Sequence, residues 1–291
     1  MATLQSAREQ YEVQQRISAE AVLVARRLRF DSLPRLTAVV AGFQAAAATT
    51  GAAYVPEALV EQDIDAETIA TPDARTLAGW SSYGLALAPL LEQVRLPGVE
   101  AYRFDRLIAS QVQDAGRNGQ ALQMAVTPAA TTYVRQVNPP ACARCILLAG
   151  KKYRKNQGFD RHPLCDCTHV PTDEENGDDV AFDPVAYFDS LPSAAELDDL
   201  YPDLTVAMRR EAGLWSQEDR FTKHGAELIR AAPASKRQYV MGRTVNTRWM
   251  KHSTAGDGRR RRAMPADLVR RSGGDRVTLL RLMRANGYIR Y

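Results

Sequence analysis

The sequence predicts a mainly α-helical protein that carries a small cysteine- and histidine-rich module with short strands. Three observations predict this fold class: apolar residues recur at helical spacing in the N-terminal part, all four cysteines fall between Cys142 and Cys167, and positive charge gathers after Arg220. We therefore expect four parts, which are a helical domain at 1–130, a zinc-knot module at 131–172, an acidic linker at 173–204 and a basic, α-rich C-terminal region at 205–291.

Two helices are expected at the start of the chain, and Ser32 and Pro34 separate them. Their apolar stripes are Ile17, Ala21, Val24 and Leu28 in the first helix, over residues 1–30, and Leu36, Val40, Phe43 and Ala47 in the second. The stretch from Leu36 to Pro56 is uncharged and has the length of a membrane span. Its many alanines favour a buried, closely packed helix instead, and we expect no membrane contact.

The rest of the N-terminal domain is expected to be helical between short connections. Pro56, the acidic stretch 61–67 and Pro72 mark such connections. Residues 73–94 predict a helical piece that is interrupted near Gly79 and Gly84. After a turn at Pro97-Gly98, a further apolar stripe runs from Phe104 to residue 127. These stripes are typical of core packing, and none of them carries a catalytic pattern.

A short strand and two groups of metal-ligand residues follow the helical domain. Residues 131–137 are β-branched and aromatic, which predicts the strand, and Asn138-Pro139-Pro140 turns the chain away from it. The first group is the Cys-x2-Cys pair of Cys142 and Cys145. The second group consists of His162, Cys165, Cys167 and His169.

This spacing is typical of a structural zinc site, because zinc prefers four thiolate or imidazole ligands in a tetrahedron. Six side chains compete for the four places. We expect Cys142, Cys145 and Cys167 to bind, together with either His162 or Cys165, and His169 is the least favoured. Zinc would supply much of the folding free energy of so short a module, on the order of 10 kcal/mol.

Other interpretations of the cysteines stay open. They could form two disulfides or lie as small buried thiols, although the chain begins without an export signal and a reducing cytosol disfavours disulfides. A catalytic zinc would need an open coordination position and a nearby acid or base, and nothing assigns that role to Asp166.

Charge is strongly segregated along the chain, although the net charge is only +4. Residues 170–208 contain eleven acidic and no basic side chains, whereas residues 220–291 contain eighteen basic and four acidic ones, a balance of +14 that leaves −10 for residues 1–219. A basic region on an acidic body favours a polyanionic partner over a merely solvated face. The candidate nucleic-acid contacts are Arg259, Arg260, Arg261, Arg262, Arg270 and Arg271.

Two short helices are expected at the end of the chain. Pro265 opens the first, which ends at Gly273-Gly274. Asp275 is expected to cap the N-terminus of the second helix, which Asn286-Gly287 closes. Further upstream, Ser193-Ala-Ala-Glu196 has the form of a capping box and predicts another helix start.

Short blocks of residues in the second half of the chain carry a family resemblance. They are Tyr133-Val134-Arg135, Cys142-Ala-Arg-Cys145, Leu148-Ala-Gly150, Tyr153, Gly158-Phe159, Arg161-His162-Pro163, Cys165-Asp166-Cys167, Pro171, Tyr187–Leu191, Phe221, Gly225–Arg230, Met264-Pro265 and Leu282–Ile289. In order and spacing these blocks resemble the Mu F-like minor head proteins of tailed phages, in particular the branch found in phages of actinobacteria. The chain departs from the family's usual segments at Ala231-Ala232-Pro233 and at Gln238–Met241.

The resemblance implies a low-copy structural protein of the phage head that acts in head assembly, DNA packaging or ejection. Its implied partners are the portal protein, the major capsid protein and packaged double-stranded DNA, which it would bind non-specifically through phosphates. It would be made in the host cytoplasm and would end inside the capsid of the virion.

Two alternative functions stay open. Relatives in actinobacterial phages are often labelled capsid maturation proteases, but the chain has no Gly-x-Ser-x-Gly and no His-Glu-x-x-His, and only His224 and His252 lie outside the cysteine-rich segment. A zinc-containing DNA-binding protein or nuclease is the second alternative, although no His-Asn-His pattern follows the cysteines. The sequence therefore favours a structural protein over an enzyme.

Overall fold

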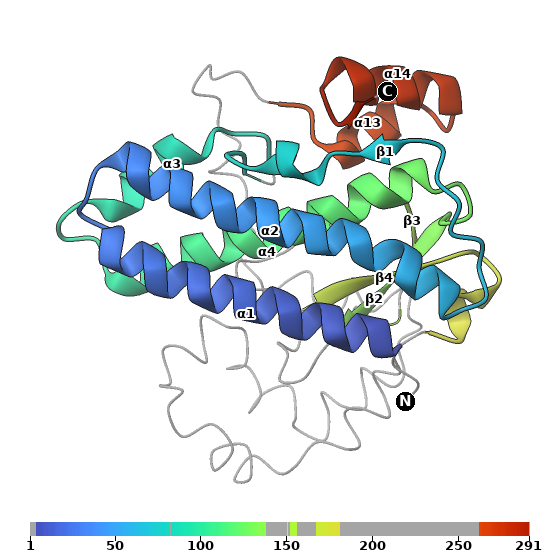
Figure 1. Cartoon of the computed structure of the whole chain (residues 1–291), viewed down its shortest axis with the longest axis horizontal. Helices are drawn as coiled ribbons and strands as arrows, with labels where there is room; N and C mark the ends of the chain where they lie inside the picture. Colours follow the sequence, from blue (N-terminus) through green and yellow to red (C-terminus); the bar gives the residue numbers. More distant parts are fainter. Residues whose placement is uncertain are drawn as a thin grey trace, which may run out of the picture.

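The computed structural model describes residues 4–81, 83–137, 150, 152–155, 167–180 and 262–290, and all structural statements below concern these residues. They form a mainly helical body with a small three-stranded sheet and a C-terminal helical hairpin (Figure 1). The mainly α fold class is therefore confirmed. The Cys142–Cys145 pair, His162, Cys165 and most of the acidic linker lie outside the described residues.

Three long helices build the body: α1 (Gln5–Leu28), α2 (Leu33–Val60) and α4 (Ala101–Val126). The Ser32 hydroxyl accepts a hydrogen bond from the Arg35 amide and so caps α2, as an N-cap serine should. The sequence predicted a connection at Pro56, but α2 continues through it to Val60. Val55, Ala58 and Leu59 are buried around this proline, so packing keeps the last turn helical despite the lost hydrogen bond.

The buried stripe of α1 differs from the predicted one. The residues of α1 that are buried are Ala7, Gln10, Gln14, Ser18, Ala21 and Ala25, whereas Ile17, Val24 and Leu28 are only partly buried. Half of this stripe is polar, and hydrophobic periodicity gives such positions no weight. The α1 helix therefore meets its neighbours through small and amide-bearing side chains.

The α2 and α4 helices approach each other closely enough for backbone contact. A Cβ atom added at Gly51 would overlap the carbonyl oxygen of Gly116 and lie 2.9 Å from its carbonyl carbon. One added at Gly119 would overlap the carbonyl group of Ala48. Glycine at these positions lets the two backbones touch, which a larger residue would prevent. The close packing expected for alanine-rich α2 is therefore confirmed on the side that faces α4.

By length and composition alone, α2 could also cross a membrane: its mean hydropathy reaches 1.3 over a window that is 39% buried. Among the described helices it is the one that passes this test. Long core helices pass it as well, and α2 packs against α1, α3 and α4.

The connection between α2 and α4 is interrupted where the sequence predicted. Strand β1 (Thr71–Pro72) leads into a 3-10 turn, η1 (Ala74–Leu77), and α3 (Leu87–Arg95) begins ten residues later. Gly79 and Gly84 both have positive φ, 79° and 74°, which glycine adopts without strain. The helical piece expected at 73–94 is therefore two short helices joined by a loop.

The three-stranded sheet has the order β3-β2-β4, and both outer strands run antiparallel to the central one. Its strands are β2 (Thr132–Val137), β3 (Lys152–Arg154) and β4 (Cys167–Thr172), followed by the short turn η2 (Asn176–Asp178). Val134 and Val170 pack with Ala7, Tyr54 and Ala58, so the sheet packs against α1 and α2. The strand expected at 131–137 is confirmed.

The C-terminal hairpin shares a core with the helical body. It consists of α13 (Pro265–Arg271), α14 (Arg276–Ala285) and β5 (Ile289–Arg290), and β5 pairs with β1. Leu268, Met283 and Tyr288 are fully buried in a cluster with Leu77 and Leu122. The Asp275 carboxylate accepts a hydrogen bond from the Thr278 amide, so the predicted cap of α14 is confirmed.

Candidate metal centre at the sheet edge

The register of the sheet brings the two halves of the cysteine-rich segment to one edge. Val137 ends β2 and pairs with Cys167, which begins β4. Cys142 follows Val137 by five residues, a length of chain that reaches at most about 18 Å. Cys165 precedes Cys167 by two residues. Both groups of candidate ligands are therefore tethered to the same end of the same strand pair.

Two of the six candidate ligands belong to the described residues, and they share a face of the sheet. Side chains alternate along a strand, so Cys167 and His169 point to one side together with Arg135 and Tyr133. Cys167 is 1% and His169 6% exposed. The His169 ring packs against Tyr133 with ring centroids 4.5 Å apart, and Tyr133 stacks on Tyr153 at 5.4 Å.

This face also buries a cation. Arg135 is 1% exposed and pairs in register with His169, which places it diagonally across from Cys167. Burial raises the pKa of the Tyr153 hydroxyl, and Cys167 adds to this, whereas Arg135 opposes it. Arg135, Tyr133 and His169 therefore share this buried face of the sheet with Cys167.

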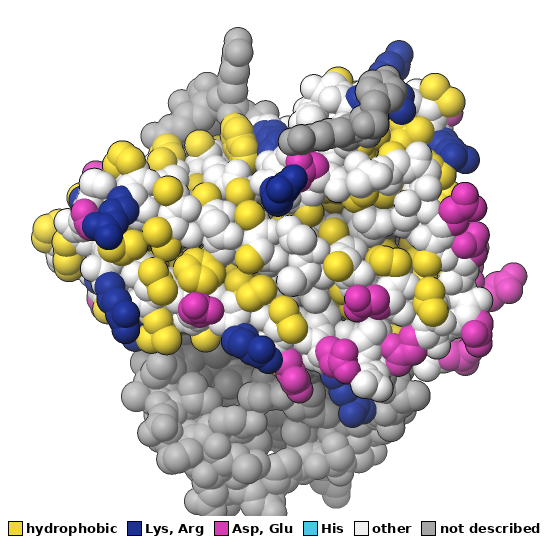
Figure 2. All heavy atoms as spheres, viewed as in Figure 1, with side chains coloured by type: hydrophobic (Ala, Val, Ile, Leu, Met, Phe, Trp, Pro, Cys, Tyr) yellow, Lys and Arg dark blue, Asp and Glu magenta, His cyan; other side chains and the backbone are white. Residues whose placement is uncertain are grey.

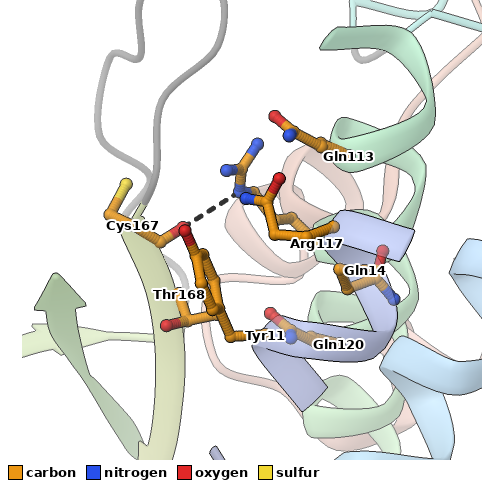
Figure 3. A pocket seen from close by; sticks show the side chains of 8 residues that line it. Tyr11, Gln14, Gln113, Arg117, Gln120, Cys167 and Thr168 are labelled. Atoms are coloured by element: carbon orange, nitrogen blue, oxygen red, sulfur yellow. Dashed lines mark hydrogen bonds between the residues drawn. The ribbon is translucent and has the colours of Figure 1, made fainter. Parts of the chain in front are cut away.

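The backbone of Cys167 is fixed from α4. The Arg117 side chain donates from Nε to the Cys167 carbonyl oxygen at 3.1 Å, and its Nη1 lies 3.1 Å from Asp114 Oδ1. Figure 3 shows this hydrogen bond, with the Cys167 sulfur directed away from the arginine. Because Arg117 is only 8% exposed, the bond ties the first residue of β4 to the core helix.

A small pocket lies behind this edge, between α1, α4 and β4 (Figure 3). Its lining residues are Tyr11, Gln14, Gln15, Gln113, Arg117, Gln120, Cys167 and Thr168. The amide nitrogen of Gln14 donates to the Ala47 carbonyl at 2.9 Å and to the Thr50 hydroxyl at 2.8 Å. Among the described residues, the side-chain oxygens of Gln14, Gln113 and Gln120 meet no hydrogen-bond donor. Buried oxygens of this kind bind water.

The metal site itself is not fully contained in the described residues. Cys142, Cys145, His162 and Cys165 lie outside them. Within them, no group of three or more histidine, cysteine or acidic residues is placed to hold a metal ion. The zinc site therefore stays a prediction, which the shared sheet edge and the two soft ligands on one face support.

The six arginines predicted to contact nucleic acid have three different settings. Arg259, Arg260 and Arg261 lie outside the described residues, and Arg270 and Arg271 are exposed on α13. Arg262 is held inside the fold: its guanidinium lies 4.3 Å from the Tyr288 ring and 5.6 Å from the Trp80 ring. It also donates to the carbonyl oxygens of Thr76 and Asn286.

Sequence reasoning missed the roles of Arg117 and Arg135, which hold and surround Cys167. Arg135 could have been noticed because it follows Tyr133 by two residues and so shares its face of the strand, where an arginine is buried with it. Arg117 gives no such signal, since α4 is polar at many buried positions.

No protein-family model matches this chain, and no curated protein or solved structure is significantly similar to it.

Proposed function

We propose that this chain is a structural minor protein of a tailed-phage head, in which a zinc ion ties the sheet to the cysteine-rich segment. The observation that carries the proposal is the pairing of Val137 with Cys167, which tethers both ligand groups to one edge. The order of the sequence blocks that resemble Mu F-like minor head proteins supports the assignment to a phage head.

The residues at the edge fit a structural zinc rather than a labile one. Cys167 supplies a thiol, and Arg117 holds its backbone carbonyl in place. Zinc would supply a cross-link between segments that are far apart in sequence. The sheet brings the two ligand groups together, because the end of β2 pairs with the start of β4.

The distribution of charge supports a position between protein and DNA. Acidic side chains gather on one rim, beyond the end of α2 and near η2 (Figure 2). The exposed members are Glu57, Glu61, Asp63, Asp65, Glu67, Glu174, Glu175, Asp178 and Asp179. This rim would be repelled by packaged DNA, whereas an adjacent portal or capsid subunit could meet it. The basic C-terminal part of the chain would face the DNA.

Localisation in assembled particles tests the proposal. The chain, carrying a terminal tag, is co-expressed with the portal and major capsid proteins of the same genome, and purified heads are analysed by quantitative mass spectrometry and cryo-electron microscopy. We expect far fewer copies of the chain than of the major capsid protein, with tag density at the portal vertex. Purified heads that contain none of the co-expressed chain would overturn the proposal.

The same experiment separates the protease alternative. If the chain is a capsid maturation protease, the major capsid protein is cut at a defined bond, and one serine or histidine substitution abolishes the cut. We expect the major capsid protein to have the same length with and without the chain.

A further inference from the structure

The C-terminal hairpin carries an unusual set of charged side chains. Residues 262–290 contain seven arginines, no lysine and two aspartates. Five of these arginines are exposed: Arg270, Arg271, Arg276, Arg281 and Arg284. Both aspartates have local structural roles, since Asp267 pairs with Arg270 and Asp275 caps α14. The exposed surface of the hairpin is therefore strongly cationic, and Figure 2 shows dark blue side chains around it.

Two arginines of α14, Arg281 and Arg284, lie on the side that faces away from the body. Leu279 and Met283 are buried against the body. At 100° per residue, Arg281 and Arg284 project from the opposite side of the helix. Val277, 75% exposed, lies on that side too. Arg276 begins the helix beside the Gly273-Gly274 turn, and Arg271 ends α13 on the other side of that turn.

Several contacts fix this surface to the body. The Arg262 guanidinium packs between the Tyr288 and Trp80 rings, and β5 pairs with β1. The Tyr288 hydroxyl donates to the Ala263 carbonyl at 2.8 Å, and burial raises the pKa of Tyr288 to about 12. The arginines are thus presented on a rigid support, so little order has to be gained when they bind.

We propose that this face of α13 and α14 is the surface through which the protein contacts the phosphates of double-stranded DNA. The proposal deepens the proposed function, on which it rests: it keeps Arg271 among the predicted contacts, removes Arg262 and adds Arg276 and Arg281. Arginine rather than lysine suits phosphate, because its planar fork donates two parallel hydrogen bonds. Among the described residues of the hairpin, Val277 is the one large exposed apolar side chain, which is too little to insert into a membrane.

The test measures binding of the full chain to a 30-base-pair duplex by fluorescence anisotropy at several salt concentrations. The variant R271Q/R276Q/R281Q removes three exposed arginines of the hairpin. The matched control R8Q/R16Q/R27Q removes three exposed arginines of α1 and changes the net charge equally. Thermal melting by circular dichroism confirms that both variants fold.

We expect the hairpin variant to lose roughly tenfold in affinity per arginine at 0.1 M salt and to lower the salt slope by about 2–3. The α1 variant should keep most of the wild-type affinity. Equal losses in the two variants would overturn the hairpin as the contact surface while leaving DNA binding in place. No binding by the wild type would remove the DNA part of the proposed function as well.

A competition experiment separates duplex DNA from an acidic protein surface. Polyglutamate of matched charge is added to the preformed complex. We expect it to displace the duplex only weakly, because a flexible polyglutamate chain does not hold its carboxylates in the fixed array that the duplex phosphates form. Displacement at an equal concentration of charge would overturn the assignment to DNA.

Discussion

Substituting Gly51 by alanine tests how α2 and α4 pack. The new methyl group would overlap the carbonyl oxygen of Gly116, and its carbonyl carbon would be 2.9 Å away. Both are backbone atoms, so no side chain can rotate out of the way and the two helices must separate. Gly42 is the matched control, since it lies in the same helix and a methyl group there would meet no atom within 4 Å.

The two substitutions are expected to act in opposite directions. Alanine in place of a helical glycine stabilises by about 1 kcal/mol, and Gly42→Ala should show this gain alone. Gly51→Ala receives the same gain but adds overpacking that costs about 1–3 kcal/mol, at the upper end here because the clash is with backbone. The two variants should therefore differ by about 2–3 kcal/mol, or roughly 4–12 °C in melting temperature.

Urea denaturation followed by circular dichroism at 222 nm measures this difference. Gly119→Ala is a second test of the same interface, because its methyl group would overlap the Ala48 carbonyl. If Gly51→Ala and Gly119→Ala are as stable as Gly42→Ala, the close backbone contact between α2 and α4 does not exist and the description of the core is wrong.

Three further predictions concern caps and clamps. Glu61 accepts hydrogen bonds from the Gln5 and Ser6 amides at the start of α1; burial acts to raise its pKa, but these bonds outweigh it and lower the pKa below 4.5. The stabilisation by the Glu61 carboxylate is therefore present above its unfolded pKa and is lost as the pH falls through its folded pKa. Glu61→Gln should then lower the free energy of unfolding by about 0.5–1 kcal/mol at pH 7 and leave it unchanged near pH 2. Urea titrations at both pH values measure this difference. Arg262→Lys keeps the charge but loses the stacked plane and the forked donors, and it should cost about 1–2 kcal/mol in thermal melts; an unchanged melt would show that the clamp is dispensable. Asp275→Ala removes the cap of α14 and should speed amide hydrogen exchange in that helix while α1 exchanges as before; equal exchange in α14 would refute the cap.

Helix boundaries were the most predictable part of this fold. Ser32, Asp275 and Asn286-Gly287 mark helix ends through local hydrogen bonds and backbone preferences, which the sequence displays directly. The strand at Thr132–Val137 was predictable for a similar reason, since β-branched and aromatic residues alternate there. Packing alone decided that α2 runs on past Pro56.

Burial of polar residues could not be predicted from periodicity. Gln14 is buried because its amide finds the Ala47 carbonyl and the Thr50 hydroxyl on a neighbouring helix, and those partners are over thirty residues away in sequence. The docking of β5 onto β1 is another long-range choice, joining residues 71–72 to 289–290. Local patterns contain neither contact.

The candidate site was predictable in composition but not in setting. The cysteine spacing indicated which side chains could bind zinc, and it ranked His169 last. The structure places His169 on the same face as Cys167, beside Tyr133, so it stays a candidate. Arg262 was predicted to contact nucleic acid from its place in a run of four arginines, whereas its aromatic and carbonyl partners hold it inside the fold.

Metal content is the most direct test of the zinc-tied sheet edge. Purified full-length protein and the variants Cys145→Ser and Cys167→Ser are analysed by inductively coupled plasma mass spectrometry and thermal melting, with His224→Ala as a control outside the segment. We predict one zinc per chain in the wild type and the control, and loss of both zinc and several degrees of melting temperature in the two cysteine variants. A wild-type protein that melts at the same temperature with and without chelator, and carries no stoichiometric metal, would contradict the account.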